Sequence, residues 1–141
     1  MSISGRVKRM VFWIGLAVLV AFMVFVRVSP IDPAVWHVPV AADQDRDLAG
    51  GAVRVVPGDA EMLQRMDAVL RDVPRTRVLD GSVQTGHITY VTRSAVFGFP
   101  DMTTVQLRDG EIRLFARLRF GASDLGVNRA RLERVISAAQ R

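Results

Sequence analysis

A block of seventeen consecutive uncharged residues, Met10 to Val26, constrains this chain more than any other feature. As an α-helix the block spans about 25 Å, and Arg27 can extend its charged end into water so that Val28 adds to the span. That length approaches the ~30 Å hydrocarbon thickness of a bilayer, which predicts a transmembrane helix over residues 10–28. A buried helix of a soluble domain is not expected, because the block has no polar face.

A cleaved signal peptide is the alternative interpretation of this block. The apolar region of such a peptide is normally about 7–15 residues long and is followed closely by small residues. Here the nearest small pair, Ala41-Ala42, is distant, so we expect a retained anchor. Three basic residues precede the block and one follows it (Arg6, Lys8, Arg9 and Arg27). This asymmetry predicts that residues 1–9 stay in the cytoplasm.

Charge and cysteine content limit the partners. The absence of cysteine excludes disulfides, zinc–thiolate sites and thiol nucleophiles. The net charge of +5 suggests nucleic-acid binding, but four of the 19 basic residues flank the apolar block. The other 15 share the rest of the chain with 14 acidic residues. That part is nearly neutral, so we expect no nucleic-acid partner.

The segment from residue 29 to residue 51 has the composition of a tether. It contains three prolines, an Asp-Gln-Asp-Arg-Asp run and a Gly-Gly pair, which favour a spacer that holds the domain away from the bilayer. Trp36 lies within the tether and is interpreted in two ways, at the outer headgroup level or packed on the domain, with packing slightly favoured.

The remaining residues, 52–141, predict a small α+β domain. Strands are expected at 52–56, 76–79 and 85–93, with a turn at Asp80-Gly81-Ser82 between the last two. Asp59 is placed to cap a helix that Pro74 ends, and its methionines are expected to fill the core. A second helix closes the chain, with Leu125, Leu132, Val135, Ile136 and Ala139 as its buried stripe and Arg129, Arg131 and Arg134 outside it. We expect an antiparallel sheet of 4–5 strands with two helices packed on one face.

Asp109-Gly110 is a strong hairpin signal between strands 103–108 and 111–116. A two-residue turn pairs Arg108 with Glu111 and places Leu107, Ile112, Val105 and Leu114 on one face, which Leu118 and Phe120 continue. The other face then carries Arg113, Phe115, Arg117 and Arg119, here called the arginine stripe. It is either an open basic surface for an acidic partner or anionic ligand, or an ordinary solvated sheet face.

Two motifs resemble a known family. They are Arg-Ser-Ala-Val-Phe-Gly-Phe-Pro-Asp at 93–101 and Gly-Ala-Ser-Asp-Leu-Gly-Val-Asn-Arg-Ala-Arg at 121–131. Over residues 52–141 the chain resembles the bacterial family called domain of unknown function 1499, whose members look like small secreted, lipid-anchored or membrane-anchored domains. Together with the cytoplasmic N-terminus expected from the flanking charges, a bacterial origin predicts an inner-membrane protein with its C-terminal domain in the periplasm. The chain departs from the family pattern at Met102, where many relatives have an acidic residue, and it lacks an upstream cysteine-containing segment that is common in them.

The second motif gathers polar residues where the closing helix begins. The candidate cluster is Asp101, Arg119, Ser123, Asp124, Asn128 and Arg129, which could hold an anion at the helix N-terminus. The alternative is structural: Asp124 caps the helix, Asn128 ties the turn, and Arg119 pairs with Asp101 or Asp124.

No catalytic spacing is present. His87 and Tyr90 lie three apart on a strand and therefore point to opposite faces, and nothing in the sequence brings His87 to Asp101 or Asp124. We expect no cofactor or metal and a non-catalytic, single-pass protein that docks on a membrane or periplasmic protein as an accessory subunit. The alternative function is binding of an anion or lipid headgroup, and an enzyme is the least favoured.

Overall fold

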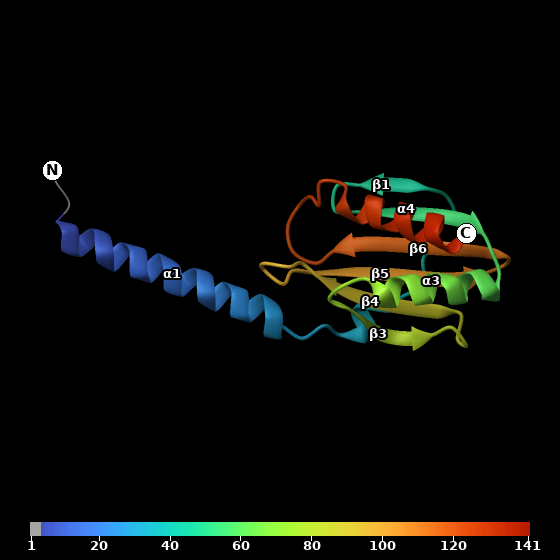
Figure 1. The fold of residues 1–141 in the computed structure, drawn as a ribbon, viewed down its shortest axis with the longest axis horizontal. Helices are drawn as coiled ribbons and strands as arrows, with labels where there is room; N and C mark the ends of the chain where they lie inside the picture. Colours follow the sequence, from blue (N-terminus) through green and yellow to red (C-terminus); the bar gives the residue numbers. More distant parts are fainter. Residues whose placement is uncertain (1–3) are drawn as a thin grey trace.

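The computed structural model describes residues 4–141 and contains a six-stranded antiparallel sheet in the order β1-β2-β6-β5-β4-β3. The strands are β1 (Arg46–Leu48), β2 (Gly51–Pro57), β3 (Thr76–Ser82), β4 (His87–Arg93), β5 (Pro100–Arg108) and β6 (Glu111–Leu118). Two helices, α3 (Ala60–Asp72) and α4 (Val127–Ala139), cover one face (Figure 1). The predicted α+β class and helix placement are confirmed. The predicted count of 4–5 strands is too low, because the tether contributes β1.

The β5–β6 hairpin has the predicted register. Arg108 is opposite Glu111, Leu107 opposite Ile112 and Val105 opposite Leu114. Asp109 and Gly110 both have positive φ, 55° and 77°, as the tight turn that joins such strands requires.

The core lies between the sheet and the two helices. Asp59 accepts a hydrogen bond from the Met62 N–H at 2.9 Å and caps α3 as predicted. The apolar stripe of α3 then packs on the sheet. Its buried residues are Met62, Leu63, Met66 and Leu70. In α4, Leu132, Val135 and Ala139 are buried and Ile136 is partly buried.

Four expectations about individual residues and element bounds are wrong. Leu125 is 94% exposed instead of buried, because α4 begins only at Val127 and Leu125 lies in the preceding turn. Phe120 leaves the core face and contacts the ring of Phe25 in α1 (Gly5–Val28). Asp80, Gly81 and Ser82 lie inside β3, just after a register shift between Val78 and Asp80, rather than in a turn. Strand β4 begins at His87 rather than residue 85.

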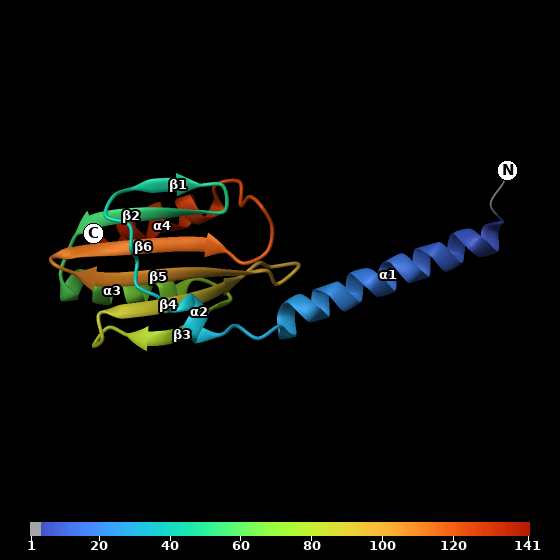
Figure 2. The same ribbon diagram turned by 180° about the vertical axis from the view of Figure 1, so that it is seen from behind.

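The tether is not a free spacer. It runs across the face of the sheet opposite α3 and α4 and includes the short helix α2 (Pro33–Trp36) (Figure 2). Val40 is buried, and its N–H donates to the Gln106 side chain at 3.0 Å. Trp36 packs on the domain, as favoured. The folded unit therefore includes most of residues 29–51.

Helix α1 extends away from the domain (Figure 1). Its side chains are exposed except near its C-terminal end, where Val26 is buried. The helix is long and apolar enough to cross a membrane, and a signal sequence meets the same criteria.

Candidate functional site

The arginine stripe does lie on the sheet face opposite the helices, but the tether covers its centre. The Arg117 guanidinium donates to the Trp36 carbonyl at 2.6 Å and to Thr104 Oγ1 at 3.2 Å. It also lies over the rings of Trp36 and Phe115, 5.3 Å and 4.5 Å from their centroids. Burial lowers the pKa of Arg117 to about 10, so it stays protonated at neutral pH. Arg117 fastens the tether to the sheet.

The ends of the stripe are also engaged. Arg119 donates to the side chain and carbonyl of Ser29, at 3.0 Å and 3.4 Å. Arg113 pairs with Glu111 at 3.3 Å. The stripe is therefore neither an open basic surface nor an ordinary solvated face.

The closing turn has the geometry of a helix cap. Asp124 accepts hydrogen bonds from the N–H groups of Gly126 and Asn128, both at 3.0 Å, and Ser123 Oγ accepts from the Leu125 N–H at 3.3 Å. Burial opposes ionisation of Asp124, but these backbone donors outweigh it and lower its pKa. The capping role predicted for Asp124 is present.

The rest of the predicted polar cluster does not gather around that cap. Asn128 is fully buried and donates to Asp101 Oδ2 at 3.3 Å, while Arg131 approaches the same oxygen at 3.5 Å. Burial raises the pKa of Asp101 even though Arg131 opposes that shift. Arg131 is buried here, contrary to expectation, and replaces Arg119 as the partner of Asp101. Arg129 instead pairs with Asp47 at 3.4 Å.

The candidate acid–base residues are separated, as expected. Tyr90 faces the helices and donates to Asp67 Oδ1 at 2.6 Å; burial and that hydrogen bond raise its pKa. His87 faces the tether, where its ring stacks on His37 with centroids 3.9 Å apart. Burial and the His37 charge lower the pKa of His87. These two stacked rings are called the histidine pair below.

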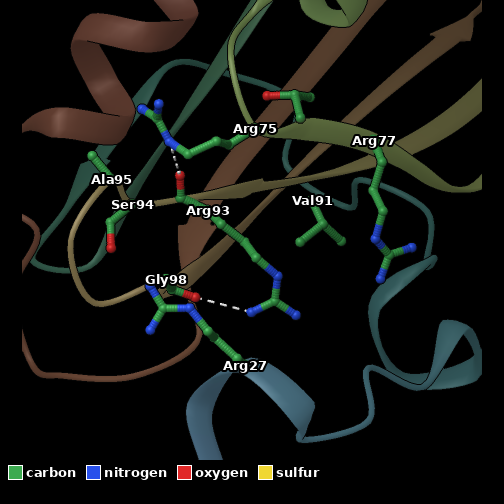
Figure 3. A pocket seen from close by; sticks show the side chains of 9 residues that line it. Arg27, Arg75, Arg77, Val91, Arg93, Ser94, Ala95 and Gly98 are labelled. Atoms are coloured by element: carbon green, nitrogen blue, oxygen red, sulfur yellow. Dashed lines mark hydrogen bonds between the residues drawn. The ribbon is translucent and has the colours of Figure 1, made fainter. Parts of the chain in front are cut away.

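A different site lies at the end of the domain nearest α1. Arginines from three separate segments line a pocket of about 370 Å³ (Figure 3). Arg27 comes from the last turn of α1, Arg75 from the turn just before β3, Arg77 from the start of β3, and Arg93 from the end of β4. We call this the arginine pocket.

Local structure places these four side chains around the pocket. In β3 and β4, Arg77 is opposite Val91, so its side chain extends beside that of Arg93 (Figure 3). Arg75 has a φ of 59°, a conformation unusual for a residue with a side chain, and its Nε donates to the Arg93 carbonyl at 3.0 Å. Arg93 in turn donates to the carbonyls of Gly98 and Val26, at 2.9 Å and 3.3 Å.

The arginine pocket has no counter-charge among residues 4–141. None of the carboxylates described by the structure lies within 4.0 Å of the four guanidinium groups. Burial lowers the pKa of Arg93, and repulsion from Arg77, Arg119 and Arg27 lowers it further. Like charges in a partly desolvated site favour a bound anion, and guanidinium groups match phosphate and carboxylate oxygens in geometry.

Sequence reasoning missed this pocket. Arg27 was interpreted only as a flank of the apolar block, and Arg75, Arg77 and Arg93 were not singled out. The usable signal was the Arg-Thr-Arg sequence at 75–77, which places two arginines where the chain enters a strand.

Helix α1 is joined to this end of the domain by further contacts. Arg27 donates to the carbonyls of Val96 and Phe97, at 2.8 Å and 3.0 Å. The ring of Phe22 contacts that of Phe99, with centroids 6.1 Å apart. The loop 94–99, which carries the Phe-Gly-Phe motif, thus packs along the last turns of α1.

Comparison with known proteins identifies a family for this chain. No curated protein matches the chain. One similar solved structure is that of a DUF4468 family protein from Bacteroides ovatus ATCC 8483, at 14% identity, covering 67% of this chain and 68% of the other. Its TM-score of 0.33 is too low to support any argument. The model of the family described as "Protein of unknown function (DUF1499)" matches residues 30–138, a range that includes most of the tether. The chain therefore belongs to the DUF1499 family.

Proposed function

We propose that this chain is a non-catalytic, single-pass membrane protein whose domain binds an anionic group in the arginine pocket. The observation that carries the proposal is that Arg27, Arg75, Arg77 and Arg93 line one pocket, with no carboxylate of the described residues within 4.0 Å of their guanidinium groups. Most other arginines of the domain are neutralised by ion pairs or fastened to the tether, as Arg54 and Arg117 are.

The arrangement in the membrane follows from α1. The helix acts as a retained anchor of the inner membrane, with its basic N-terminus in the cytoplasm and the domain in the periplasm. Its contacts with the loop 94–99 support a domain that sits directly on the membrane surface, because the tether folds back over the sheet and leaves little free chain between them.

The separation of the titratable groups supports a non-catalytic role. His87 faces the tether, whereas Asp101 contacts α4 on the opposite face of the sheet. A general base and its partner must lie within hydrogen-bond reach of a shared substrate. The acid–base set considered from the sequence is therefore not assembled at one place.

Phosphate titration of the full-length protein in a maltoside detergent tests the proposal by calorimetry. Arg77→Gln is the informative variant, because the Arg77 side chain makes no hydrogen bond or ion pair within residues 4–141. Loss of one guanidinium–phosphate contact should raise the Kd for phosphate by about tenfold. The matched control is Arg134→Gln, an exposed position on α4 with the same change of charge. Equal Kd values for the two variants, or no binding by the unaltered protein, would refute the proposal.

Docking on another membrane or periplasmic protein is the second candidate. The observation that favours it is the position of β3 at the edge of the sheet, where one side of its backbone has no neighbouring strand among residues 4–141 and could accept a strand from a partner. Affinity purification after mild solubilisation should then recover a stoichiometric partner. Recovery of none in several detergents would count against this function.

A further inference from the structure

The arginine pocket lies at the level where α1 meets the domain. Arg27 lines the pocket from the last turn of α1, and the Val26 carbonyl accepts a hydrogen bond from Arg93. If α1 crosses a bilayer, its apolar block ends at Val26. The guanidinium groups then lie just outside the hydrocarbon, at the depth of the lipid phosphates.

The loop 94–99 extends past the pocket toward the N-terminal end of α1. Phe99 contacts Phe22, which precedes Arg27 by five residues and lies ~7.5 Å further along the helix axis. Two apolar side chains of this loop are exposed, Val96 at 66% and Phe97 at 39%. With α1 in a bilayer, these side chains reach the interfacial region, where aromatic and aliphatic groups are favoured over water.

We propose that the arginine pocket binds the phosphate of a membrane phospholipid while the loop 94–99 inserts into the same leaflet. This inference rests on the proposed function, and it names the source of the anion. A phospholipid carries its phosphate immediately outside its acyl chains. The protein offers matching groups side by side: guanidinium groups that line the pocket, and the exposed side chains of Val96 and Phe97 in the loop whose carbonyls Arg27 binds.

A lipid is favoured over a dissolved anion for two reasons. A soluble phosphate would use the guanidinium groups but leave the exposed apolar residues of the loop unexplained. In addition, α1 holds the pocket beside the leaflet, so lipid phosphates are present at a high effective concentration without diffusion from solution. A dissolved anion must compete with them.

Competition with lipid tests the inference on the full-length protein. The probe is glycerol phosphate, titrated into protein in maltoside, which contains no phosphate, and into protein in phosphatidylglycerol nanodiscs. We expect binding in maltoside and an apparent Kd at least roughly tenfold higher in nanodiscs, where lipid occupies the pocket. Equal Kd values in the two preparations would overturn the lipid assignment and leave the proposed function standing. No binding in maltoside would overturn both.

The depth of the loop is a second, independent measurement. The chain has no native cysteine, so Val96→Cys introduces a single position for a nitroxide label. In nanodiscs, the label at 96 should be accessible to oxygen and protected from a water-soluble relaxation agent. Arg108→Cys, at an exposed position at the end of β5 beside the β5–β6 turn, is the control and should show the reverse. Equal exposure of both labels to the water-soluble agent would overturn the insertion of the loop.

Discussion

Replacing Arg117 with Met should release the tether from the sheet. Arg117 donates to the Trp36 carbonyl at 2.6 Å and lies over two aromatic rings. A hydrogen bond from a charged donor contributes about 1.5–3 kcal/mol, and each contact with a ring about 0.5–1 kcal/mol. Removing a buried guanidinium also removes its desolvation penalty. We therefore expect the free energy of unfolding to fall by about 2–3 kcal/mol.

Arg113→Met is the matched control for this prediction. Arg113 lies on the same strand and the same face, and its ion pair is with a partly exposed glutamate on its own strand, which contributes at most ~1 kcal/mol. Urea unfolding of the full-length protein in maltoside, followed by circular dichroism, gives both values. Limited proteolysis should also cleave residues 37–45 faster in the Arg117→Met variant. Equal destabilisation by the two substitutions would refute the role of Arg117 in holding the tether.

Three further predictions concern the buried polar groups. Tyr90→Phe removes the 2.6 Å hydrogen bond to Asp67 and should lower the free energy of unfolding by about 1–2 kcal/mol in the same urea titration; no change would mean that the bond adds nothing to stability. Asn128→Ala should cost about 2–3 kcal/mol because it removes the buried hydrogen bonds of Asn128 with Asp101 and Arg131. By contrast Ser123→Ala, at an exposed turn, should cost less than ~1 kcal/mol; equal losses would contradict the buried network. The lowered pKa of His87 means that the contribution of this residue to stability is present above its ordinary pKa of 6.5 and is lost as the pH falls from there toward the folded-state pKa. The Tm of the protein should therefore drop between about pH 7.5 and about pH 5.5. A drop of the same size in the His87→Gln variant would exclude the histidine pair as the cause.

The parts of the fold that were predictable depend on local chemistry. Asp109-Gly110 fixes the hairpin register because the turn accepts only residues that tolerate positive φ. Asp59 and Pro74 mark the ends of α3 for equally local reasons, a side-chain cap and a missing N–H. Hydrophobic spacing identified the face that each helix buries. These features require no knowledge of distant segments.

The covering of the sheet by the tether could not be predicted in the same way. Its contacts join residues far apart in the chain, such as Trp36 to Arg117 and Val40 to Gln106. Proline and charge in residues 29–51 are equally compatible with a free spacer. The arginine stripe therefore looked open in the sequence, although Arg117 and Arg119 both hydrogen-bond to the tether.

The arginine pocket was missed for a related reason. Its residues come from α1, β3 and β4, and they meet only because β3 pairs with β4 at the end of the sheet where α1 approaches. Strand order was not derivable from the sequence. The predicted cluster around Asp124 failed in part for the converse reason: Arg119 and Asp101 lie beside each other across the β5–β6 hairpin but point to opposite faces of the sheet.

Thermal unfolding in phosphate and in chloride, at equal ionic strength, tests the central claim most directly. A ligand that binds only the folded state stabilises it by about 2.7 kcal/mol at one hundred times its Kd. We predict that phosphate raises the Tm of the full-length protein and of Arg134→Gln, and that Arg77→Gln loses most of this increase. An identical Tm in the two salts would contradict an anion site in the arginine pocket.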